Sequence, residues 1–304
     1  MYGTVEVLLP TYNGAKFLLA MLKSISAQSY PNVLLTVRDD GSSDETHKLL
    51  LQYADCHPNM RVMQGERLGA MGSFFYLLQH AASDTEYFAF CDQDDVWLPD
   101  KVERAVAAIR EHRADVPVLY CSRIECVDEE LRHLGYLKVP RRIGFANALV
   151  ENIAAGCTMV LNRRARNLIC ERLPLNAPFH DWWCYLAISA LGEVIYDPRP
   201  AIKYRQHANN HTGATASAWE LFRLRRARFL QHQEGARLMS DQAVEFKRCF
   251  GGLLSARDKE ILDRFLSVRG SITERISYSA AMDVWRQSRL DTALLRALIL
   301  MGRA

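Results

Sequence analysis

Blocks of apolar and polar residues alternate along the first third of the chain. Short apolar runs are typical of buried strands, and apolar residues three and four positions apart are typical of helices. The helical spacing is seen at Leu18, Met21, Leu22 and Ile25. Strand and helix patterns follow one another in turn, which predicts an α/β fold with a mostly parallel sheet flanked by helices on both faces. The predicted strands are 5–9, 34–37, 61–64 and 87–91.

Capping and proline signals predict where several elements begin and end. Ser42 and Glu45 have the spacing of a capping box, which predicts a helix with Ser42 as its N-cap. Pro198 and Pro200 are expected to interrupt the chain. Beyond residue 217 the pattern is almost entirely helical. The other expected elements are helices at 71–82, from Pro99 to about 113, at 164–173 and at 181–191, and strands at 157–161 and 194–196.

The composition is that of a globular protein. The chain has 304 residues, of which 49% are hydrophobic and 24% charged. No apolar run approaches the roughly 18 residues of a membrane-spanning helix, so we expect a cytoplasmic protein. The eight cysteines are scattered without a C-x-x-C pair. This argues against a zinc or redox motif and favours reduced, buried thiols.

The charge is unevenly distributed along the chain. The net charge of +3 is too small to predict a nucleic-acid partner. Residues 217–304 hold 16 Lys and Arg against 10 Asp and Glu, a balance of +6, whereas residues 1–216 hold 22 against 25, a balance of −3. Arginines alternate with apolar residues at 219–229 and 289–303. Such basic amphipathic helices predict peripheral binding to an anionic membrane, with a helical lid or a homodimer contact as alternatives.

Acidic residues follow two of the predicted strands. Asp39 and Asp40 follow the second strand, and Asp92, Asp94 and Asp95 follow the fourth. Ligands of open parallel sheets bind beyond the carboxyl ends of the strands, where these acids are expected to meet. Their mutual repulsion is most simply relieved by a hard divalent cation, Mg²⁺ or Mn²⁺. For Asp39 and Asp40 ordinary turn chemistry is the alternative.

Two common phosphate-binding motifs are absent from the sequence. The chain has no G-x-x-x-x-G-K-[ST] and no G-x-G-x-x-G after the first strand, which argues against a P-loop enzyme and a dinucleotide site. Gly69 and Gly72 open a predicted helix. They are expected either to allow tight packing or to let backbone N–H groups approach a ribose or diphosphate.

Four segments in the first third resemble the family 2 glycosyltransferases of the GT-A fold, especially their bacterial rhamnosyltransferase-like members. The segments are VEVLLPTYNG, RDDGSSDET, GAMGSFF and FCDQDDVWLPDKV, and the resemblance extends over roughly residues 4–212. It implies that Asp39 binds the base, and that Asp92 and Asp94 bind the ribose and the metal on the diphosphate. The nucleotide or donor residues implied are Pro10, Thr11, Tyr12, Asn13, Asp39, Asp40, Gly69, Gly72, Asp92, Gln93 and Arg205.

The resemblance continues in GCTMVLNR, FHDWW and YRQHANN. It implies that Asp181 is the catalytic base, although an Asp at this place is otherwise typical of a helix N-cap. It also suggests that His207 contacts the metal or the diphosphate, with an ordinary surface histidine as the alternative. The acceptor residues implied are Gly156, Cys157, Thr158, Trp182 and Trp183, and for the two tryptophans core packing is the alternative.

The resemblance implies three regions and an inverting, metal-dependent glycosyl transfer. Residues 1–115 would form the nucleotide-sugar half of the GT-A domain, 116–216 its acceptor half, and 217–304 a basic helical extension. The favoured reaction moves L-rhamnose from dTDP-rhamnose to a glycan or lipid-linked acceptor in bacterial surface polysaccharide synthesis, at the cytoplasmic face of the inner membrane. A UDP-hexose or UDP-N-acetylhexosamine donor is the runner-up. A nucleotidyltransferase and a non-catalytic nucleotide-sugar binding protein are alternatives of other classes.

Overall fold

A computed structural model of the chain describes residues 2–206 and 238–303. The chain divides into two compact units. The first comprises Met1–Val139, Ala154–Glu171 and Gly192–Gly213, and the second comprises Pro140–Ile153, Arg172–Leu191 and Ala214–Ala304. Across residues 2–206 and 238–303, no helix combines the length and apolarity needed to cross a bilayer.

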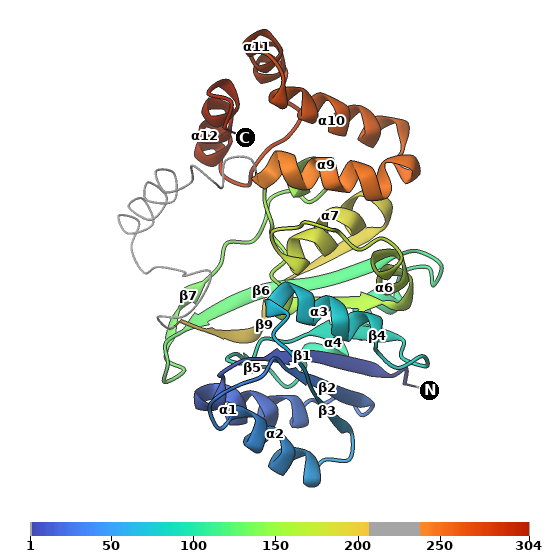
Figure 1. Cartoon of the computed structure of the whole chain (residues 1–304), viewed down its shortest axis with the longest axis vertical. Helices are drawn as coiled ribbons and strands as arrows, with labels where there is room; N and C mark the ends of the chain where they lie inside the picture. The colour runs from blue at the N-terminus through green and yellow to red at the C-terminus, as the bar shows by residue number, and fades with distance from the viewer. Residues whose placement is uncertain (1, 207–237, 304) are drawn as a thin grey trace. The chain divides into compact units, whose positions relative to one another are not determined.

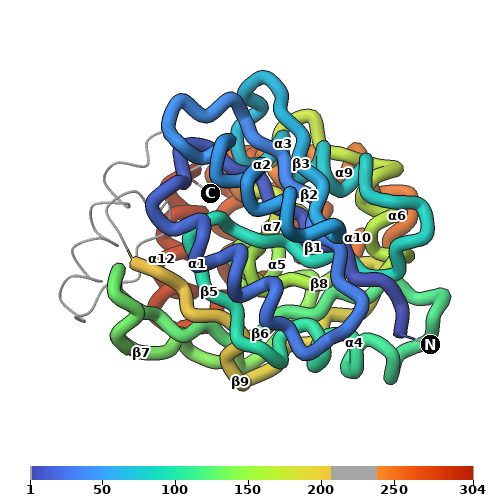
Figure 2. Tube along the Cα trace, turned by 90° about the horizontal axis from the view of Figure 1, so that it is seen from below, coloured from blue at the N-terminus to red at the C-terminus, as the bar shows by residue number. Residues whose placement is uncertain are grey.

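The first unit is built on a sheet of nine strands (Figure 1). The strand order is β3-β2-β1-β4-β8-β6-β9-β5, with β7 paired to β6, and Figure 2 shows β3 and β9 toward opposite edges. Strands β1 to β4 pair in parallel, whereas β8 joins β4 and β6 antiparallel. The strands are β1 (Val5–Thr11), β2 (Val33–Asp39), β3 (Met60–Gln64), β4 (Tyr87–Phe90), β5 (Val96–Trp97), β6 (Val118–Val127), β7 (His133–Tyr136), β8 (Val160–Asn162) and β9 (Glu193–Arg205).

Helices cover both faces of this sheet. Figure 1 shows α1 and α2 on one side of β1 and β2, and α3 on the other side, next to α6. Strand β1 is buried on both faces, as expected for a central parallel strand. The helices are α1 (Ala15–Ser26), α2 (Thr46–Asp55), α3 (Gly69–Gln79), α4 (Lys101–Arg110) and α6 (Arg163–Cys170), with a 3₁₀ turn η1 (Gly156–Thr158).

The second unit is helical. Its core includes Trp183, whose ring centroid lies 6.0 Å from that of Phe246 and 5.8 Å from that of Phe250. Both phenylalanines are fully buried. The helices are α5 (Phe145–Ala148), α7 (His180–Leu191), α9 (Leu238–Phe250), α10 (Ala256–Leu266), α11 (Ile272–Ala280) and α12 (Arg289–Leu300), with 3₁₀ turns η3 (Gly251–Leu253) and η4 (Ser267–Arg269).

The predicted α/β class is confirmed, and three local predictions are wrong. Helix α2 begins at Thr46, because Ser42 bonds to Asp39 instead of capping the helix. Strand β9 continues through Pro198 and Pro200, since a register shift of β6 against β9 lets the chain bulge there. Only the last part of the predicted strand 157–161 is extended, because η1 occupies its beginning. Strands β6 and β7 were not predicted, and the segment 219–229 lies outside the described residues.

Candidate active site

The loops after β1 and β2 are tied to each other at the carboxyl edge of the sheet. The backbone N–H of Asn13 donates to Ser42 Oγ at 2.9 Å, and the N–H of Ser43 donates to Asn13 Oδ1 at 2.8 Å. Asn13 has a φ of 48°, a left-handed conformation that asparagine tolerates better than most residues. The two loops therefore form one surface.

The loop after β4 joins the same surface through Gln93. The backbone N–H of Tyr12 donates to Gln93 Oε1 at 3.0 Å, and Gln93 Nε2 donates to the Tyr12 carbonyl at 3.1 Å. A Cβ atom at Gly14 would lie 2.2 Å from Gln93 Oε1, so glycine is needed for this approach. Tyr12 and Asn13 are exposed and Gln93 is half-buried, and Arg67 lies over the Tyr12 ring at 4.1 Å.

Asp39 lies at the centre of these loops and is fully buried. Its Oδ1 accepts hydrogen bonds from Thr11 Oγ1 at 3.0 Å and from Ser42 Oγ at 2.5 Å. Its Oδ2 accepts from the Ser42 backbone N–H at 3.1 Å. In this structure the carboxylate thus holds the β1 and β2 loops together. Pro10, also predicted at the site, is the half-buried residue of β1 just before Thr11.

Asp40 faces the N-terminus of α3. Its Oδ2 accepts from the backbone N–H groups of Leu68 at 3.2 Å and Gly69 at 2.9 Å, and its Oδ1 accepts from Arg38 and Ser73. Gly69 has a φ of 73°, which favours glycine. Because its N–H is bound to Asp40, these contacts favour a packing role for Gly69. A Cβ atom at Gly72 would lie 3.0 Å from Leu68 Cβ, which also indicates close packing.

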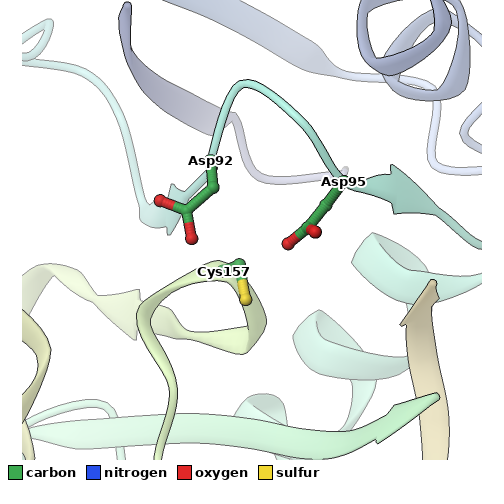
Figure 3. Close-up of side chains that lie close together, drawn as sticks. All are labelled: Asp92, Asp95 and Cys157. Carbon is green, nitrogen blue, oxygen red and sulfur yellow. The ribbon is translucent and has the colours of Figure 1, made fainter. Parts of the chain in front are cut away.

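Asp92, Asp95 and Cys157 approach one another beyond β4 (Figure 3). One ligand atom of each lies within 4.8 Å of the others. Asp92 is half-buried, whereas Asp95 and Cys157 are buried. Asp95 Oδ1 accepts the backbone N–H of Arg205 at 3.1 Å, and the Cys157 thiol also donates a hydrogen bond to this carboxyl. Burial, together with the charges of Asp94 and Asp92, raises the pKa of the Asp95 carboxyl well above its usual range.

Arg205, the last residue of β9, supports the loop after β4 that carries Asp92, Asp94 and Asp95, here called the acid loop. Its Nε donates to the Asp94 carbonyl at 2.9 Å, its guanidinium bonds to the Glu129 carbonyl, and it lies 4.5 Å from the Phe17 ring centroid. The side chain is buried. Arg205 therefore fixes the backbone of the loop in this structure.

Lys101 is a charged side chain that the sequence analysis did not single out. It begins α4, is fully buried, and its Nζ lies 3.2 Å from the Trp97 ring centroid. This Nζ has no hydrogen-bond acceptor within residues 2–206 and 238–303. Burial lowers the pKa of the Lys101 ammonium to about 8, although Asp95 and Asp92 act in the opposite direction. A buried lysine has no sequence signal, because lysine is mostly exposed in proteins.

The acid loop fits a hard divalent cation. Carboxylate oxygens are the ligands that Mg²⁺ and Mn²⁺ prefer, and here two carboxylates and a thiol, from Asp92, Asp95 and Cys157, bring ligand atoms within 4.8 Å of one another. The predicted ligands were Asp92, Asp94 and His207. The structure groups Asp92 with Asp95 and Cys157, leaves Asp94 half-buried on the same loop, and does not describe His207.

The predicted base and two of the acceptor residues lie in the second unit. Asp181 is in the first turn of α7, and its Oδ1 accepts the backbone N–H of Trp182 at 2.7 Å. Trp182 is buried, and its Nε1 donates to the Ala148 carbonyl at 2.7 Å. Trp183 is fully buried against phenylalanines of α9. Core packing, the alternative weighed for both tryptophans, fits this burial. In the first unit, Gly156 and Thr158 are buried with Cys157 in η1.

Comparison with known proteins identifies the family. Residues 6–167, just over half of the chain, match the model of glycosyl transferase family 2. The chain belongs to glycosyl transferase family 2. It is therefore a glycosyltransferase.

The curated relatives of this glycosyltransferase are distant. An uncharacterized glycosyltransferase of Rickettsia typhi is 25% identical over 299 residues, which cover 90% of each chain. A dTDP-rhamnosyl transferase of Shigella flexneri is 27% identical over 226 residues, covering 68% of this chain and 74% of that one. A UDP-Glc:α-D-GlcNAc-diphosphoundecaprenol β-1,3-glucosyltransferase of Escherichia coli is 28% identical over 188 residues, covering 60% and 69%.

Solved structures share the fold of this family 2 transferase. Residues 1–349 of S. aureus TarS in complex with UDP-GlcNAc superpose with a TM-score of 0.60 at 17% identity, covering 99% of this chain and 82% of that one. A mannosyltransferase of Pyrobaculum calidifontis in complex with GDP-Man and Mn²⁺ gives a TM-score of 0.56 at 19% identity, covering 99% and 86%. The likeness establishes the GT-A-type fold that the sequence predicted.

Proposed function

We propose that this family 2 enzyme transfers a sugar from a nucleoside diphosphate to an acceptor hydroxyl, with inversion at the anomeric carbon. The observation that carries the proposal is the surface formed by the loops after β1, β2 and β4. Gln93 and Asn13 join these loops, and Asp92 and Asp94 lie half-buried on it. Open parallel sheets bind nucleotides at this edge. A variant of the proposed base tests the catalytic step separately from donor binding.

The favoured donor is dTDP-rhamnose, with a UDP-hexose or UDP-N-acetylhexosamine as the runner-up. The Shigella flexneri relative, named as a dTDP-rhamnosyl transferase, supports the first. The Escherichia coli relative, named as a UDP-Glc transferase, supports the second. Tyr12 and Asn13, which are exposed on the loop after β1, would contact the nucleoside in either case.

Asp92 and Asp94 would hold Mg²⁺ or Mn²⁺ against the donor diphosphate. When bound, the cation offsets the negative charge that grows on the departing nucleoside diphosphate. Arg205 and Gln93 fix the backbone on which both carboxylates stand. Residues 1–115 would thus serve the nucleotide and 116–216 the acceptor.

Asp181 would act as the base that accepts the proton of the acceptor hydroxyl as its oxygen attacks. The carboxylate is half-buried, and the N–H of Trp182 fixes its orientation at one oxygen. No second carboxylate is needed as a nucleophile, because inversion takes place in one displacement.

The acceptor would be a glycan or lipid-linked saccharide of bacterial surface polysaccharide, at the cytoplasmic face of the inner membrane. Helix α12 supports this, because Leu290 and Leu294 on the helix and Met301 directly after it are 74%, 46% and 49% exposed. Three exposed arginines, Arg289, Arg296 and Arg303, lie on or beside the same helix. An apolar stripe flanked by arginines matches the surface of an anionic bilayer.

Thermal unfolding of the full chain with dTDP, UDP or GDP, each with and without Mn²⁺, tests the proposal first. A ligand at roughly 100 times its dissociation constant stabilises the fold by about 2.7 kcal/mol. We expect a Mn²⁺-dependent rise of the midpoint with dTDP. A rise of the midpoint with UDP alone would favour a UDP-hexose donor over dTDP-rhamnose. No rise with any nucleotide would refute the donor assignment.

The Asp181→Asn variant then separates catalysis from binding. It should keep the nucleotide-dependent midpoint shift and lose sugar transfer, because Asn cannot accept the proton. Asp258→Asn, at a half-buried acid in the first turn of α10, is the matched control and should keep both. Transfer that survives in Asp181→Asn would refute the assignment of the base.

A further inference from the structure

Helix α7, which carries Asp181 in its first turn, is anchored on α5 by two side chains. Trp182 Nε1 donates to the Ala148 carbonyl at 2.7 Å, and the Tyr185 hydroxyl donates to Asn147 Oδ1 at 2.9 Å. Trp182 is buried, and Tyr185 and Asn147 are fully buried. Asp181 and Tyr185 are four residues apart, so they lie one turn apart on the surface of the helix. The position of the Asp181 carboxylate therefore depends on where α5 is held.

Asn147 joins α5 to a segment far along the chain. Its Nδ2 donates to the Trp285 carbonyl at 3.0 Å and to Glu151 Oε2 at 2.9 Å. Its Oδ1 accepts from Gln287 Nε2 at 3.3 Å in addition to the Tyr185 hydroxyl. Two donated and two accepted hydrogen bonds are the full capacity of a side-chain amide. A buried polar network that is fully satisfied in this way specifies one arrangement of the elements that it joins.

Gln287 holds the chain on both sides of α5. Before the helix, its Oε1 accepts the backbone N–H of Arg141 at 2.8 Å, and its Nε2 donates to the Arg142 carbonyl at 2.6 Å. After the helix, the backbone N–H of Gln287 donates to Glu151 Oε2 at 2.7 Å. One half-buried side chain from the C-terminal part of the chain thus fixes the entry to α5, its exit and, through Asn147, its inner face.

We infer that Gln287 is a positioning residue for sugar transfer, which acts through Asn147 and α5 to fix the first turn of α7 and with it the carboxylate of Asp181. The inference rests on the proposed function, in which Asp181 is the base. It goes beyond that function because it gives the C-terminal part of the chain a role in catalysis, whereas the match to the family model ends at residue 167.

This chain of contacts lies within the second unit, to which all of its residues belong. A base must lie within hydrogen-bond reach of the proton that it accepts, so even a small displacement of α7 slows the reaction. Binding of the donor nucleotide, which is assigned to loops of the first unit, should not depend on Gln287.

Gln287→Ala in the full chain tests the inference, with Ser288→Ala as the matched control. Ser288 is the N-cap of α12, and its hydroxyl accepts the Asp291 N–H at 3.4 Å, so the control also costs stability but leaves α5 untouched. The assay is hydrolysis of dTDP-rhamnose, or of UDP-glucose if wild type prefers it, in the presence of Mn²⁺. Water attacks the anomeric carbon, the bond to the diphosphate oxygen breaks, and Asp181 takes the proton. We expect Gln287→Ala to lower kcat by about tenfold or more at an unchanged KM for the donor, and Ser288→Ala to leave both unchanged.

Tyr185→Phe breaks the same chain of contacts at its other end, because it removes only the hydroxyl that bonds to Asn147. It should lower kcat as Gln287→Ala does, and the double variant should lose less than the product of the two single losses. An unchanged kcat in folded Gln287→Ala would overturn the inference. So would independent losses that multiply in the double variant.

Hydrogen exchange followed by mass spectrometry gives a second readout that needs no turnover. The amides of residues 182–187 in α7 should exchange several-fold faster in Gln287→Ala than in wild type, and at the wild-type rate in Ser288→Ala. Unchanged exchange in Gln287→Ala would show that Gln287 does not fix α7. If wild type hydrolyses neither donor, that result counts against the proposed function alone, and the exchange of α7 still decides on Gln287.

Discussion

Replacing Asp40 should destabilise the fold and leave the donor surface intact. The carboxylate is 4% exposed and accepts hydrogen bonds from two backbone N–H groups at the start of α3 and from Ser73. It also pairs with Arg38, which is 5% exposed. In the Asp40→Ala variant this guanidinium stays buried without its carboxylate.

The expected cost follows from these contacts. Breaking a buried ion pair by removing one partner costs about 3–5 kcal/mol. Arg38 keeps its hydrogen bonds to the Glu66 carbonyl at 2.8 Å and to Ser73 at 3.1 Å, so the lower end, about 3 kcal/mol, applies here. Urea unfolding at pH 7 measures this loss, and with a slope of about 2 kcal/mol per molar the midpoint should fall by roughly 1.5 M.

Asp44→Ala is the matched control at the same edge of the sheet. Asp44 is exposed and accepts from the N–H of Thr46 at 3.0 Å, at the start of α2. Its Oδ2 also accepts the N–H of Ala15 at 3.2 Å, and loss of an exposed hydrogen bond of this kind costs about 1 kcal/mol. The reasoning is refuted if Asp40→Ala is no more destabilising than Asp44→Ala. It is also refuted if Asp40→Ala abolishes nucleotide binding at a temperature where the variant is fully folded, because Asp40 would then contact the donor.

Two further predictions concern acid stability and membrane binding. Hydrogen bonds from Arg199, Arg104 and Tyr120 outweigh burial and hold the pKa of Asp197 well below its usual range. The contribution of Asp197 to stability is therefore full above a pH of about 4 and is lost as the pH falls toward its folded-state pKa. Asp197→Asn should lower the free energy of unfolding at pH 7 and flatten the decline of that free energy below pH 4, as measured by urea titrations. An unchanged slope would contradict this. The double variant Leu290→Asp, Leu294→Asp should no longer float with anionic phosphatidylglycerol vesicles. The control Leu51→Asp, at a leucine of α2 that is 48% exposed, should still float with them. Equal binding of the wild-type protein to zwitterionic vesicles would rule out a contribution of the arginines.

The parts of the fold that the sequence predicted are those with strong local periodicity. The runs at 5–9 and 87–91 became β1 and β4 because a parallel strand buried on both faces is apolar throughout. Strand β6 was missed because its ten residues mix apolar, charged and thiol side chains, without the clear period of a half-buried strand. Its pairing with the distant β9 decides its conformation, and such long-range pairing leaves no local signal.

The errors at the site have the same origin. Ser42 has the sequence of an N-cap, yet its hydroxyl donates to Asp39 and accepts the backbone N–H of Asn13, which lies beside it because β1 and β2 pair. Local rules give way where a tertiary partner competes for the same group. The burial of Lys101 against Trp97 of β5 likewise depends on how the acid loop folds, and no local sequence rule predicts it.

The acids of the sheet edge divide into two kinds once their surroundings are considered. From the sequence, the mutual repulsion of five carboxylates called for a metal. In the structure, hydrogen-bond donors and cationic side chains of the protein itself offset much of this repulsion. Asp39 is held by Thr11 and Ser42, and Asp40 by Arg38 and the start of α3. Asp95 accepts the backbone N–H of Arg205 and a hydrogen bond from the Cys157 thiol.

These three acids are buried, and each fixes a loop. Asp92 and Asp94 are half-buried at the surface that the loops form. We therefore propose that a divalent cation acts at these two carboxylates, and that the other three acids hold the surrounding loops in place. Loss of metal should therefore weaken nucleotide binding far more than it weakens the fold, whereas loss of Asp40 should do the reverse.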